Sequence, residues 1–362
     1  MALRIVVTGG GTGGHVYPAL EVASHARSVG SDVLYLGSVR GQEGGACAKA
    51  VLPFVGFPSQ PLLSLRTLRG WQGLASLVRA RSSARRALRQ YRPDVVFSTG
   101  GYAAGPVVSA AQSLGVPTVL HEQNAVPGRS NLLFAKRARA VATVFHAAAR
   151  HFPGVPVERT GMPIRAELRK AAQGGPGPDL LPLVLVVGGS QGARAINEAA
   201  LGAATRMTGR GLHWIHAAGP AHFEALFASF EKLGLKHVYE VRAFLEVGPL
   251  AEAYARCSVV VTRGGAGTLT EIAAFRRPSV VCPYPFAFAD HQRHNALELE
   301  AMGACVLVDQ ATLTPTLLEE KLAMWLDDPG RREAAAAALA EWDVPDAVER
   351  IFGLVERAGG RR

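Results

Sequence analysis

The sequence predicts an α/β protein in which two doubly wound parallel sheets follow one another along the chain. Three observations carry this prediction. Short apolar runs recur, and each is followed by glycines and then by a helical pattern. The succession begins again near residue 183, directly after the loop-like stretch 173–178, which reads Gln-Gly-Gly-Pro-Gly-Pro. The length of 362 residues suits two domains, at roughly 150 residues per domain.

The apolar runs are the expected strands. Four of them lead straight into a glycine-rich segment: residues 4–8, 94–98, 183–187 and 258–262. Further strands are expected at residues 33–36, 118–120, 212–217, 238–241, 279–282 and 305–308. Strands that alternate with helices in this way are typical of parallel βαβ units.

The repeat of the pattern sets the expected domain boundary between about residues 160 and 182. We take residues 1–160 as the first domain and residues 161–344 as the second. A final helix, at roughly 345–358, follows, and residues 345–362 are expected to pack back onto the first domain. Ligands of doubly wound sheets bind beyond the carboxyl ends of the strands, where both sets of glycines fall. Two halves that face each other would therefore form one interdomain cleft.

The composition excludes several classes of protein. Hydrophobic residues make up 48% of the chain, which rules out disorder over most of its length. No apolar run approaches the roughly 18 residues of a membrane span, and the N-terminal residues do not read as a signal peptide. Four scattered cysteines without a CxxC pair fit a reduced cytoplasmic protein. We find no DxD pair near a strand end and no cluster with metal-ligand spacing, so no metal or obligatory cofactor is expected.

Positive charge is concentrated in one segment. The net charge is +10, and between Glu43 and Asp94 there are nine basic residues and no acidic one. From Trp71 onwards apolar residues interleave with arginines, a pattern that binds anionic membrane surfaces. The expected membrane patch comprises Trp71, Leu74, Leu77, Arg79, Arg85, Arg86 and Arg89. The alternative is an ordinary solvated helix packed on its sheet, and no nucleic-acid motif favours a nucleic-acid partner.

The first glycine-rich loop has the form Gly9-x-Gly11-x-x-Gly14 after a strand and before a helix, which predicts diphosphate binding rather than only a tight turn. The second expected strand ends without the acid that would hold an adenosine ribose, which disfavours a nicotinamide or flavin cofactor. His15 follows at the start of the helix. It could be a neutral general base, or it could cap the helix or contact phosphate.

Two further loops lie in the second half. Gly188-x-Ser190-x-Gly192 matches the nucleophile elbow of serine hydrolases, but a loop serine at a helix start equally suits phosphate binding, which we prefer. The segment 263–271 is a strand–loop–helix with Glu271 near the helix start. This carboxylate can accept two ribose hydroxyls, or it can serve only the helix dipole.

In this order the motifs resemble the MurG family of bacterial glycosyltransferases, which add N-acetylglucosamine to lipid I, the undecaprenyl-diphosphate-muramoyl-pentapeptide carrier, to give lipid II. The resemblance covers nearly the whole chain. The segments that carry it are 10–15, 100–102, His121-Glu122-Gln123-Asn124, 188–194, 263–271 and 290–296.

The resemblance implies a GT-B fold, inversion at the anomeric carbon and no obligatory metal. The implied donor site for UDP-GlcNAc comprises Thr12, Gly13, Gly14, Asn124, Arg165, Ser190, Leu245, Ala266, Gly267, Thr268, Leu269, Thr270, Glu271 and Gln292. Within it Glu271 would bind the ribose, the backbone of Leu245 the uracil, and Gln292 the sugar hydroxyls. His15 would be the base, with Glu122 as second candidate, and Gly100, Gly101 and Tyr102 would hold the acceptor diphosphate.

The implied partners are UDP-GlcNAc, lipid I, the anionic cytoplasmic face of the cell membrane and other proteins of cell-wall synthesis and division. One departure from the family pattern is Gly161-Met162-Pro163, where an asparagine is usual. Two rival hypotheses stay open at this point. One is another GT-B enzyme, such as a glycolipid glycosyltransferase or a UDP-GlcNAc epimerase, and the other is a non-catalytic membrane-recruiting protein.

Overall fold

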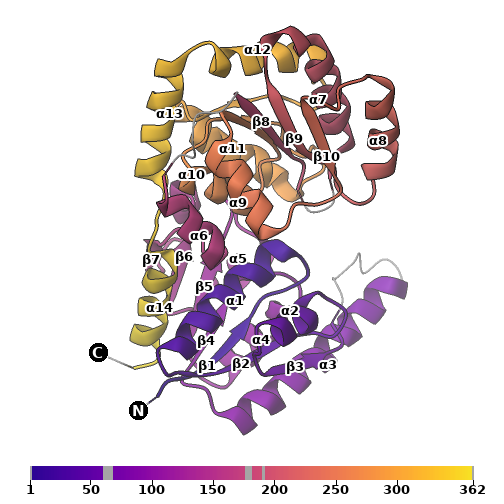
Figure 1. Ribbon diagram of the computed structural model, residues 1–362. Helices are drawn as coiled ribbons and strands as arrows, with labels where there is room; N and C mark the ends of the chain where they lie inside the picture. The colour runs from indigo at the N-terminus through magenta and orange to yellow at the C-terminus, as the bar shows by residue number, and fades with distance from the viewer. Residues whose placement is uncertain (1, 60–67, 176–181, 190–191, 361–362) are drawn as a thin grey trace. The chain divides into compact units, whose positions relative to one another are not determined.

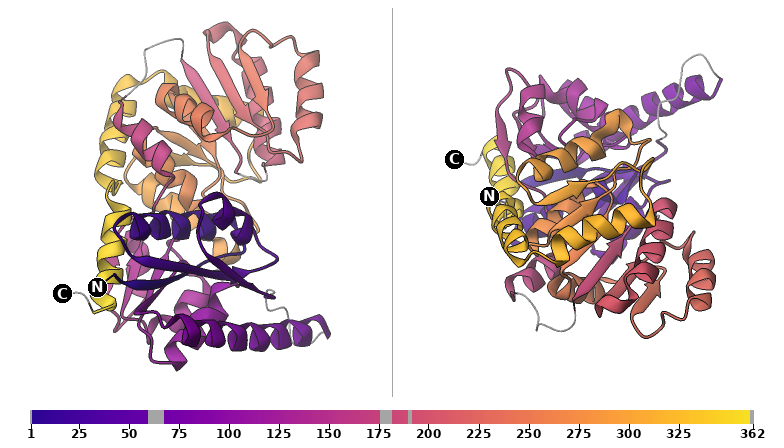
Figure 2. Two further views of the ribbon diagram at one scale, coloured as in Figure 1. Left: turned by 60° about the horizontal axis from the view of Figure 1, so that its bottom comes forward. Right: turned by 90° about the horizontal axis from the view of Figure 1, so that it is seen from above.

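The computed structural model describes residues 2–59, 68–175, 182–189 and 192–360 (Figures 1 and 2). The chain divides into two compact units. Unit 1 comprises residues 1–165 together with 346–362, and unit 2 comprises residues 166–345. Each unit is built on its own parallel sheet, so the predicted α/β class with two doubly wound sheets is confirmed.

Unit 1 contains a seven-stranded sheet in the order β3-β2-β1-β4-β5-β6-β7. Its strands are β1 (Arg4–Thr8), β2 (Asp32–Ser38), β3 (Phe54–Phe57), β4 (Val95–Ser98), β5 (Thr118–Glu122), β6 (Ala140–Thr143) and β7 (Val157–Arg159). All neighbouring pairs are parallel. Every residue of β4, β5 and β6 is buried, because helices cover both faces of the sheet.

The helices of unit 1 bury small and branched side chains against this sheet. They are α1 (Gly13–Ser28), α2 (Glu43–Lys49), α3 (Leu68–Tyr91), α4 (Ala104–Ser113), α5 (Arg129–Ala135) and α14 (Ala347–Ala358), with a 3₁₀ helix at His146–His151. On one face α1 and α14 share a core cluster with β1, which includes Val22 and Ile351. On the other face α3 and α4 pack through Ala84 and Val107.

Unit 2 repeats the architecture with six strands in the order β10-β9-β8-β11-β12-β13. The strands are β8 (Leu183–Val187), β9 (His213–Ala217), β10 (Tyr239–Arg242), β11 (Val259–Thr262), β12 (Ser279–Val281) and β13 (Cys305–Leu307). The helices are α6 (Ala166–Gln173), α7 (Arg194–Arg206), α8 (Phe223–Lys232), α9 (Val247–Arg256), α10 (Ala266–Ala274), α11 (His291–Ala301), α12 (Pro315–Leu326) and α13 (Pro329–Trp342). Short 3₁₀ turns lie at Thr208–Arg210 and Phe288–Asp290.

The strands predicted from the sequence are all present, with ends that differ by one or two residues. Three strands were missed: β3, β6 and β7. β3 contains Gly56 and has two of its four residues exposed, β6 has only four residues, and β7 has only three, all half-buried. Such short strands lack the longer apolar run on which the prediction relied.

Candidate active site

The functional loops of unit 1 lie where the strand order reverses, between β1 and β4. The loop after β1 and the loop after β4 touch, since the N–H of Gly10 donates to the carbonyl oxygen of Gly100 at 3.3 Å. A Cβ atom on Gly101 would lie 2.0 Å from the carbonyl oxygen of Gly10, and Gly101 has φ +84°. Only glycine allows this approach. The loops thus meet at the switch point, the usual ligand position of such a sheet.

α1 begins at this point. Thr12 is its N-cap residue, and the N–H groups of His15 and Val16 donate to the carbonyl oxygen of Thr12. The N–H groups of Gly13 and Gly14 precede this first helical bond and have no acceptor within the helix. Thr12 and Gly14 are exposed. The helix start therefore offers backbone donors to an anion.

His15 is held against the loop after β4. Its ring Nδ1 lies 2.8 Å from the carbonyl oxygen of Thr99, and the hydroxyl of Thr99 donates to the carbonyl oxygen of His15 at 2.7 Å. A carbonyl can only accept, so Nδ1 must carry the proton. In the neutral imidazole the lone pair is then on Nε2. Of the two roles left open for His15, this tautomer suits a base that accepts a proton at Nε2.

Glu43, the first residue of α2, lies fully buried beneath the first glycine-rich loop. Its Oε1 accepts a hydrogen bond from the N–H of Gly11 at 3.2 Å, whereas Oε2 has no protein partner among the described residues. β2 itself ends at Ser38 without an acid. Glu43, five residues past Ser38, returns to the loop, but it binds backbone from below and is not placed as a ribose ligand.

The run His121-Glu122-Gln123-Asn124 closes the end of β5. His121 is buried, and burial lowers its pKa to about 4. Its Nε2 bonds the carbonyl oxygen of Gly161 at 3.0 Å, while its Nδ1 lies 3.0 Å from the amide nitrogen of Gln123. That amide also donates to the carbonyl oxygen of Thr99 at 2.9 Å. His121 and Gln123 therefore support the loop that holds His15.

Glu122 also has a structural position. Its side chain is 1% exposed, and its oxygens accept from the N–H groups of Asn124 (2.9 Å) and Gly128 (3.0 Å) and from the amide of Asn131 (2.8 Å). Burial raises its pKa, and these hydrogen bonds oppose the rise. The amide of Asn124 is a fourth, longer donor at 3.4 Å, and a carboxylate occupied by four donors cannot readily collect a proton from a substrate. This geometry argues against Glu122 as second candidate base and assigns it to holding the 124–128 loop, including Asn124.

In unit 2 the corresponding switch point lies between β8 and β11. The Thr262 hydroxyl at the end of β11 donates to the carbonyl oxygen of Val187 at the end of β8, at 2.9 Å. The glycine-rich loop after β8 packs against the end of β9, because a Cβ on Gly192 would lie 2.1 Å from the carbonyl oxygen of Ala218. Ser190 and Gln191 lie outside the described residues. The described ends of this loop, Gly189 and Gly192, therefore lie beside the switch point of the second sheet.

α10 begins directly after β11 and carries Glu271. The helix starts at Ala266, and its first i→i−4 bond runs from Leu269 to Gly265, so the N–H groups of residues 266–268 have no helical acceptor. Glu271 is the sixth helical residue, beyond the first turn. Its Oε2 accepts from the hydroxyl of Tyr254 at 3.1 Å. The helix dipole acts mainly on charges in the first turn, and Glu271 lies beyond it, so a role for Glu271 that serves only the dipole is disfavoured. The buried Thr270 hydroxyl is used within the helix, on the carbonyl of Ala266.

Gln292 is held beside the same loop by close packing. A Cβ on Gly264 would lie 2.2 Å from the carbonyl oxygen of Gln292, and the buried Asn295 amide donates to the carbonyl oxygen of Gly264 at 3.0 Å. The side-chain Oε1 of Gln292 accepts from the N–H of Tyr284 at 2.9 Å. The amide orientation is thereby set, with the NH₂ group as the donor left to address a ligand.

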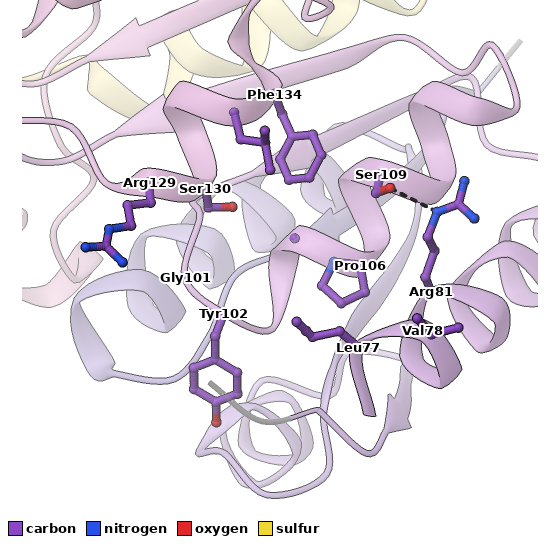
Figure 3. Close-up of a pocket in the computed structure, with 12 residues that line it drawn as sticks. Leu77, Val78, Arg81, Gly101, Tyr102, Pro106, Ser109, Arg129, Ser130 and Phe134 are labelled. Atoms are coloured by element: carbon purple, nitrogen blue, oxygen red, sulfur yellow. Dashed lines mark hydrogen bonds between the residues drawn. The ribbon is translucent and has the colours of Figure 1, made fainter. Parts of the chain in front are cut away.

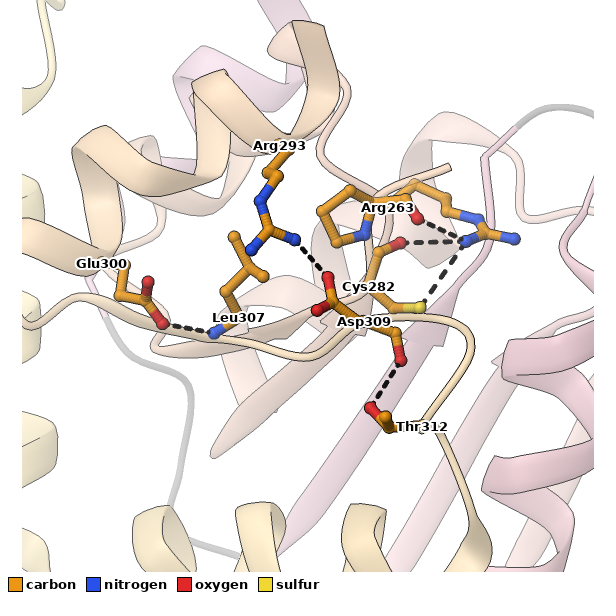
Figure 4. A network of polar contacts seen from close by, with 8 residues as sticks. Arg263, Cys282, Arg293, Glu300, Leu307, Asp309 and Thr312 are labelled. Carbon is orange, nitrogen blue, oxygen red and sulfur yellow. Dashed lines mark hydrogen bonds and ion pairs between the residues drawn. The ribbon is translucent and has the colours of Figure 1, made fainter. Parts of the chain in front are cut away.

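Arg263, for which no separate role was predicted, anchors this region (Figure 4). Its guanidinium donates to the carbonyl oxygens of Cys282 (3.0 Å) and Pro283 (3.1 Å) and to the side chain of Gln310 (2.7 Å). Burial lowers its pKa. Nearby, Arg293 forms an ion pair with Asp309. Arg263 therefore fixes the loop that leads to Gln292 and is not placed as a phosphate ligand.

Comparisons with known proteins place both halves of the chain in one family. Residues 5–143 match the glycosyltransferase family 28 N-terminal domain, and residues 183–351 match the family 28 C-terminal domain. A UDP-N-acetylglucosamine--N-acetylmuramyl-(pentapeptide) pyrophosphoryl-undecaprenol N-acetylglucosamine transferase of Solidesulfovibrio magneticus is 39% identical over 360 residues, 96% of each chain.

The chain belongs to glycosyltransferase family 28. A transferase of the same name from Anaeromyxobacter dehalogenans is 36% identical across 99% of this chain and 94% of its own. The crystal structure of Acinetobacter baumannii MurG superposes with a TM-score of 0.79 at 29% identity, covering 98% of this chain and 99% of that one. The resemblance to the MurG family and the GT-B fold are confirmed, and the protein is a UDP-sugar hexosyltransferase.

The remaining residues implied for the donor occupy separate places in this family 28 glycosyltransferase. Leu245 lies between β10 and α9 with its side chain buried, so only its backbone suits a ligand. Arg165 is half-buried and directly precedes α6. Met162, the departure from the usual asparagine, is 3% exposed and packs as an apolar residue beside Gly161, which has φ +72°.

The basic helix α3 has one face buried against the sheet and another face exposed. Ala80, Ala84 and Leu88 are buried against the sheet, whereas Arg79, Arg86 and Arg89 are exposed. Arg85 is half-buried and Leu77 lines a pocket, so these two contribute less to the outer face. The side chains of Trp71 and Leu74 lie outside the described residues.

The described residues contain no group of three or more histidine, cysteine, aspartate or glutamate side chains that could hold a metal ion. No helix in the described part of the chain is long and apolar enough to cross a bilayer.

Proposed function

We propose that this glycosyltransferase moves N-acetylglucosamine from UDP-N-acetylglucosamine to the C4 hydroxyl of the muramoyl sugar of lipid I and so makes lipid II for peptidoglycan. The hydroxyl oxygen bonds to C1 of the donor sugar while the bond from C1 to the UDP oxygen breaks, which inverts the anomeric configuration. UDP leaves with the electron pair, and the hydroxyl proton passes to the protein. Relatives named for this transfer, matched over nearly their full length, support the assignment.

Unit 2 is the donor domain in this proposal. The ribose diol is bound by Glu271, which Tyr254 orients. The diphosphate is met by Ser190 and by the N-terminal N–H groups of α10, at Ala266, Gly267 and Thr268. The Gln292 amide donates to the sugar hydroxyls. Helix N-termini stabilise the negative charge that develops on the leaving UDP, a function that a metal ion supplies in other transferases.

Unit 1 is the acceptor domain. The backbone of Gly100 and Gly101 and the start of α1 bind the acceptor's diphosphate, and Tyr102 lies beside them. Asn124, which the Glu122 carboxylate holds by its N–H and more loosely by its amide at 3.4 Å, contributes to the donor sugar together with Thr12. His15 is the base.

The observation that carries the proposal is the hydrogen bond from Nδ1 of His15 to the Thr99 carbonyl. It leaves Nε2 as the basic atom of the neutral ring, next to a helix start and two glycine loops suited to an anionic substrate. General bases contribute about 10²–10⁴-fold to rate.

The test is transfer of label from UDP-[¹⁴C]GlcNAc to a lipid I analogue by the purified protein, with product anomer analysis. We expect a β-linked product, and a kcat reduced about 10²–10⁴-fold in His15→Ala with little change in the KM for the donor. His237→Ala, an exposed histidine of unit 2, is the matched control. Transfer at the wild-type rate by His15→Ala would remove His15 as the base, and no transfer by the wild type would remove the function.

For the location, we propose attachment to the anionic cytoplasmic face of the membrane through the outer face of α3. A polyprenyl acceptor stays in the bilayer, so the enzyme must reach that surface. Arg79, Arg86 and Arg89 are exposed together, and each basic residue near an anionic surface contributes about 1 kcal/mol, which salt screens. At that surface the protein meets its lipid acceptor and other proteins of cell-wall synthesis and division.

The variant that replaces Arg79, Arg86 and Arg89 with glutamine should sediment poorly with anionic vesicles at low salt. In a control variant, glutamine replaces three arginines of unit 2, Arg206, Arg210 and Arg242, so the net charge changes by the same amount while α3 is intact. Activity on a short-chain soluble acceptor should be retained by both. Equal loss of vesicle binding in the two variants would show that net charge matters and the α3 face does not.

A further inference from the structure

Unit 1 contains a pocket whose apolar side chains have no role in the proposed transfer (Figure 3). It has a volume of about 340 Å³, within the range of small-ligand pockets. Three helices form it. Leu77 and Val78 come from α3, Pro106 from α4, and Leu133 and Phe134 from α5.

Two of these apolar side chains are strongly exposed. Val78 is 59% and Leu133 is 74% exposed, although neither has a polar atom to interact with water. Both residues line the pocket, so they belong to one apolar patch and are not isolated apolar residues on a polar surface. Burying them against an apolar ligand is favourable, which gives the pocket a driving force for binding.

The pocket is continuous with the proposed diphosphate site. Gly101 and Tyr102, in the loop after β4, also line it. The ring of Tyr102 lies against the first glycine-rich loop, since a Cβ on Gly11 would be 2.6 Å from that ring. A ligand whose anionic group sits on these loops therefore has an apolar space directly next to it, on the far side of Tyr102.

Positive charge lies at the edges of the pocket. Arg81 and Arg129 lie on opposite sides in Figure 3, and Arg81 is oriented by a 2.9 Å hydrogen bond from its Nε to the hydroxyl of Ser109. None of the described residues that line the pocket is acidic. An apolar centre with cationic edges fits an amphiphile that has an apolar chain and a negatively charged head.

We propose that this pocket binds the first isoprenoid units of the acceptor's lipid chain, next to its diphosphate; this rests on the proposed function of unit 1. The chain would run over Tyr102 between Pro106 and Leu133 and leave past Val78. α3 would thus contribute apolar side chains to the individual substrate lipid as well as arginines to the membrane surface. The pocket would fix the diphosphate, and with it the reacting sugar, in a defined position.

The test uses acceptor analogues with one head group and three tails on the diphosphate: methyl, one isoprene unit and two isoprene units. All are assayed with the purified enzyme, without detergent or vesicles. In the wild type, the acceptor KM should fall about tenfold or more from the methyl to the two-unit tail, since each buried methylene contributes about fourfold in affinity. Geranyl diphosphate should compete with the acceptor much better than inorganic diphosphate.

Leu133→Asn should raise the KM for the two-unit acceptor about three- to tenfold while leaving the KM for the methyl acceptor and for UDP-GlcNAc unchanged. Leu132→Asn is the matched control, because Leu132 is its exposed neighbour but does not line the pocket. A wild-type KM independent of tail length, or equal effects of the two substitutions, would overturn the pocket assignment. Failure of the proposed function differs, because then not even the methyl acceptor would receive label.

Discussion

His15 and Thr99 are joined by two reciprocal hydrogen bonds: the ring Nδ1 of His15 donates to the carbonyl of Thr99, and the hydroxyl of Thr99 donates to the carbonyl of His15. The pair connects the start of α1 to the loop after β4, across the switch point of the first sheet. It sets the tautomer and the position of the imidazole together. Thr99 is fully buried and acts through His15 as a positioning residue.

The first prediction concerns this connection. Thr99→Val keeps the shape but removes the hydroxyl, so kcat should fall about fivefold, the equivalent of one ordinary hydrogen bond, at an unchanged KM for UDP-GlcNAc. Thr99→Ser restores the donor and should recover most of the rate. Steady-state kinetics of the two variants give the answer, and equal rates for valine and serine would refute the role of the hydroxyl.

The second prediction concerns the contact between the two glycine loops. Gly101→Ala should lower activity severely, because its Cβ would meet the carbonyl oxygen of Gly10 at 2.0 Å and force the loops apart. Gly115→Ala is the control, since Gly115 also has a positive φ, +74°, but has open space around it. Both variants should lose about 1–2 kcal/mol of stability from backbone strain. Thermal unfolding measures the stability that each variant loses through strain. A transfer assay then shows whether Gly101→Ala loses activity that Gly115→Ala retains.

The third prediction addresses the ribose. Glu271→Ala should weaken UDP binding about tenfold or more, because charged hydrogen bonds to hydroxyls contribute about 1.5–3 kcal/mol each. Tyr254→Phe removes only the hydroxyl that orients Glu271 and should give a smaller loss. Glu252→Ala, an exposed glutamate of α9, is the control. Isothermal titration with UDP measures all three, and an unchanged affinity in Glu271→Ala would contradict the ribose role.

The fourth prediction is a pH dependence of stability. Burial lowers the pKa of His216 to about 3, while its ring nitrogens contact the hydroxyl of Tyr239 at 2.6 Å and the side-chain oxygen of Asn197 at 3.0 Å. The unfolded chain has an ordinary histidine pKa near 6.5, so it binds more protons than the folded chain between about pH 6.5 and 3. The free energy of unfolding should therefore decrease as the pH falls through this window.

For His216 the free energy of unfolding decreases by several kcal/mol at most. His121 of unit 1, with a pKa lowered to about 4, contributes a decrease in the same direction. Urea unfolding at pH 7 and pH 5 followed by tryptophan fluorescence tests it. Three of the four tryptophans, Trp214, Trp325 and Trp342, lie in unit 2, so this signal reports chiefly on the unit that contains His216. Replacing His216 with glutamine should flatten the dependence, and an equally steep one would contradict it.

The sequence predicted the sheets because their central strands are continuous apolar runs followed by glycines. It also predicted the two switch-point loops, since glycines mark close backbone approach whatever the partner. It did not find Glu43, because a buried acid five residues beyond a strand has no local pattern that aims it back at the loop. Arg263 was likewise missed as an anchor, because its acceptors are carbonyls nineteen and twenty residues further on.

The sequence also does not separate candidate catalytic residues from the residues that support them. Nothing in the run His121-Glu122-Gln123-Asn124 distinguishes the residue that faces a ligand from those that support it. The distinction arises from burial at the end of β5, which makes His121 and Glu122 structural and leaves only Asn124 half-exposed. The apolar pocket was not predicted either, because its walls come from three successive helices, α3, α4 and α5, and no local sequence pattern shows which of their side chains face one another.

The place of α14 has a consequence for how the protein is made. Unit 1 includes residues 346–362, and Ile351 and Val355 complete a core cluster with Val7 and Val22. All of unit 2, residues 166–345, is synthesised in between. At about 5–20 residues per second, the ribosome needs on the order of ten to forty seconds for that stretch. During this interval α1 already covers part of that face of the first sheet, but the area that α14 will bury stays exposed, so chaperone binding or aggregation competes with completion of the N-terminal domain.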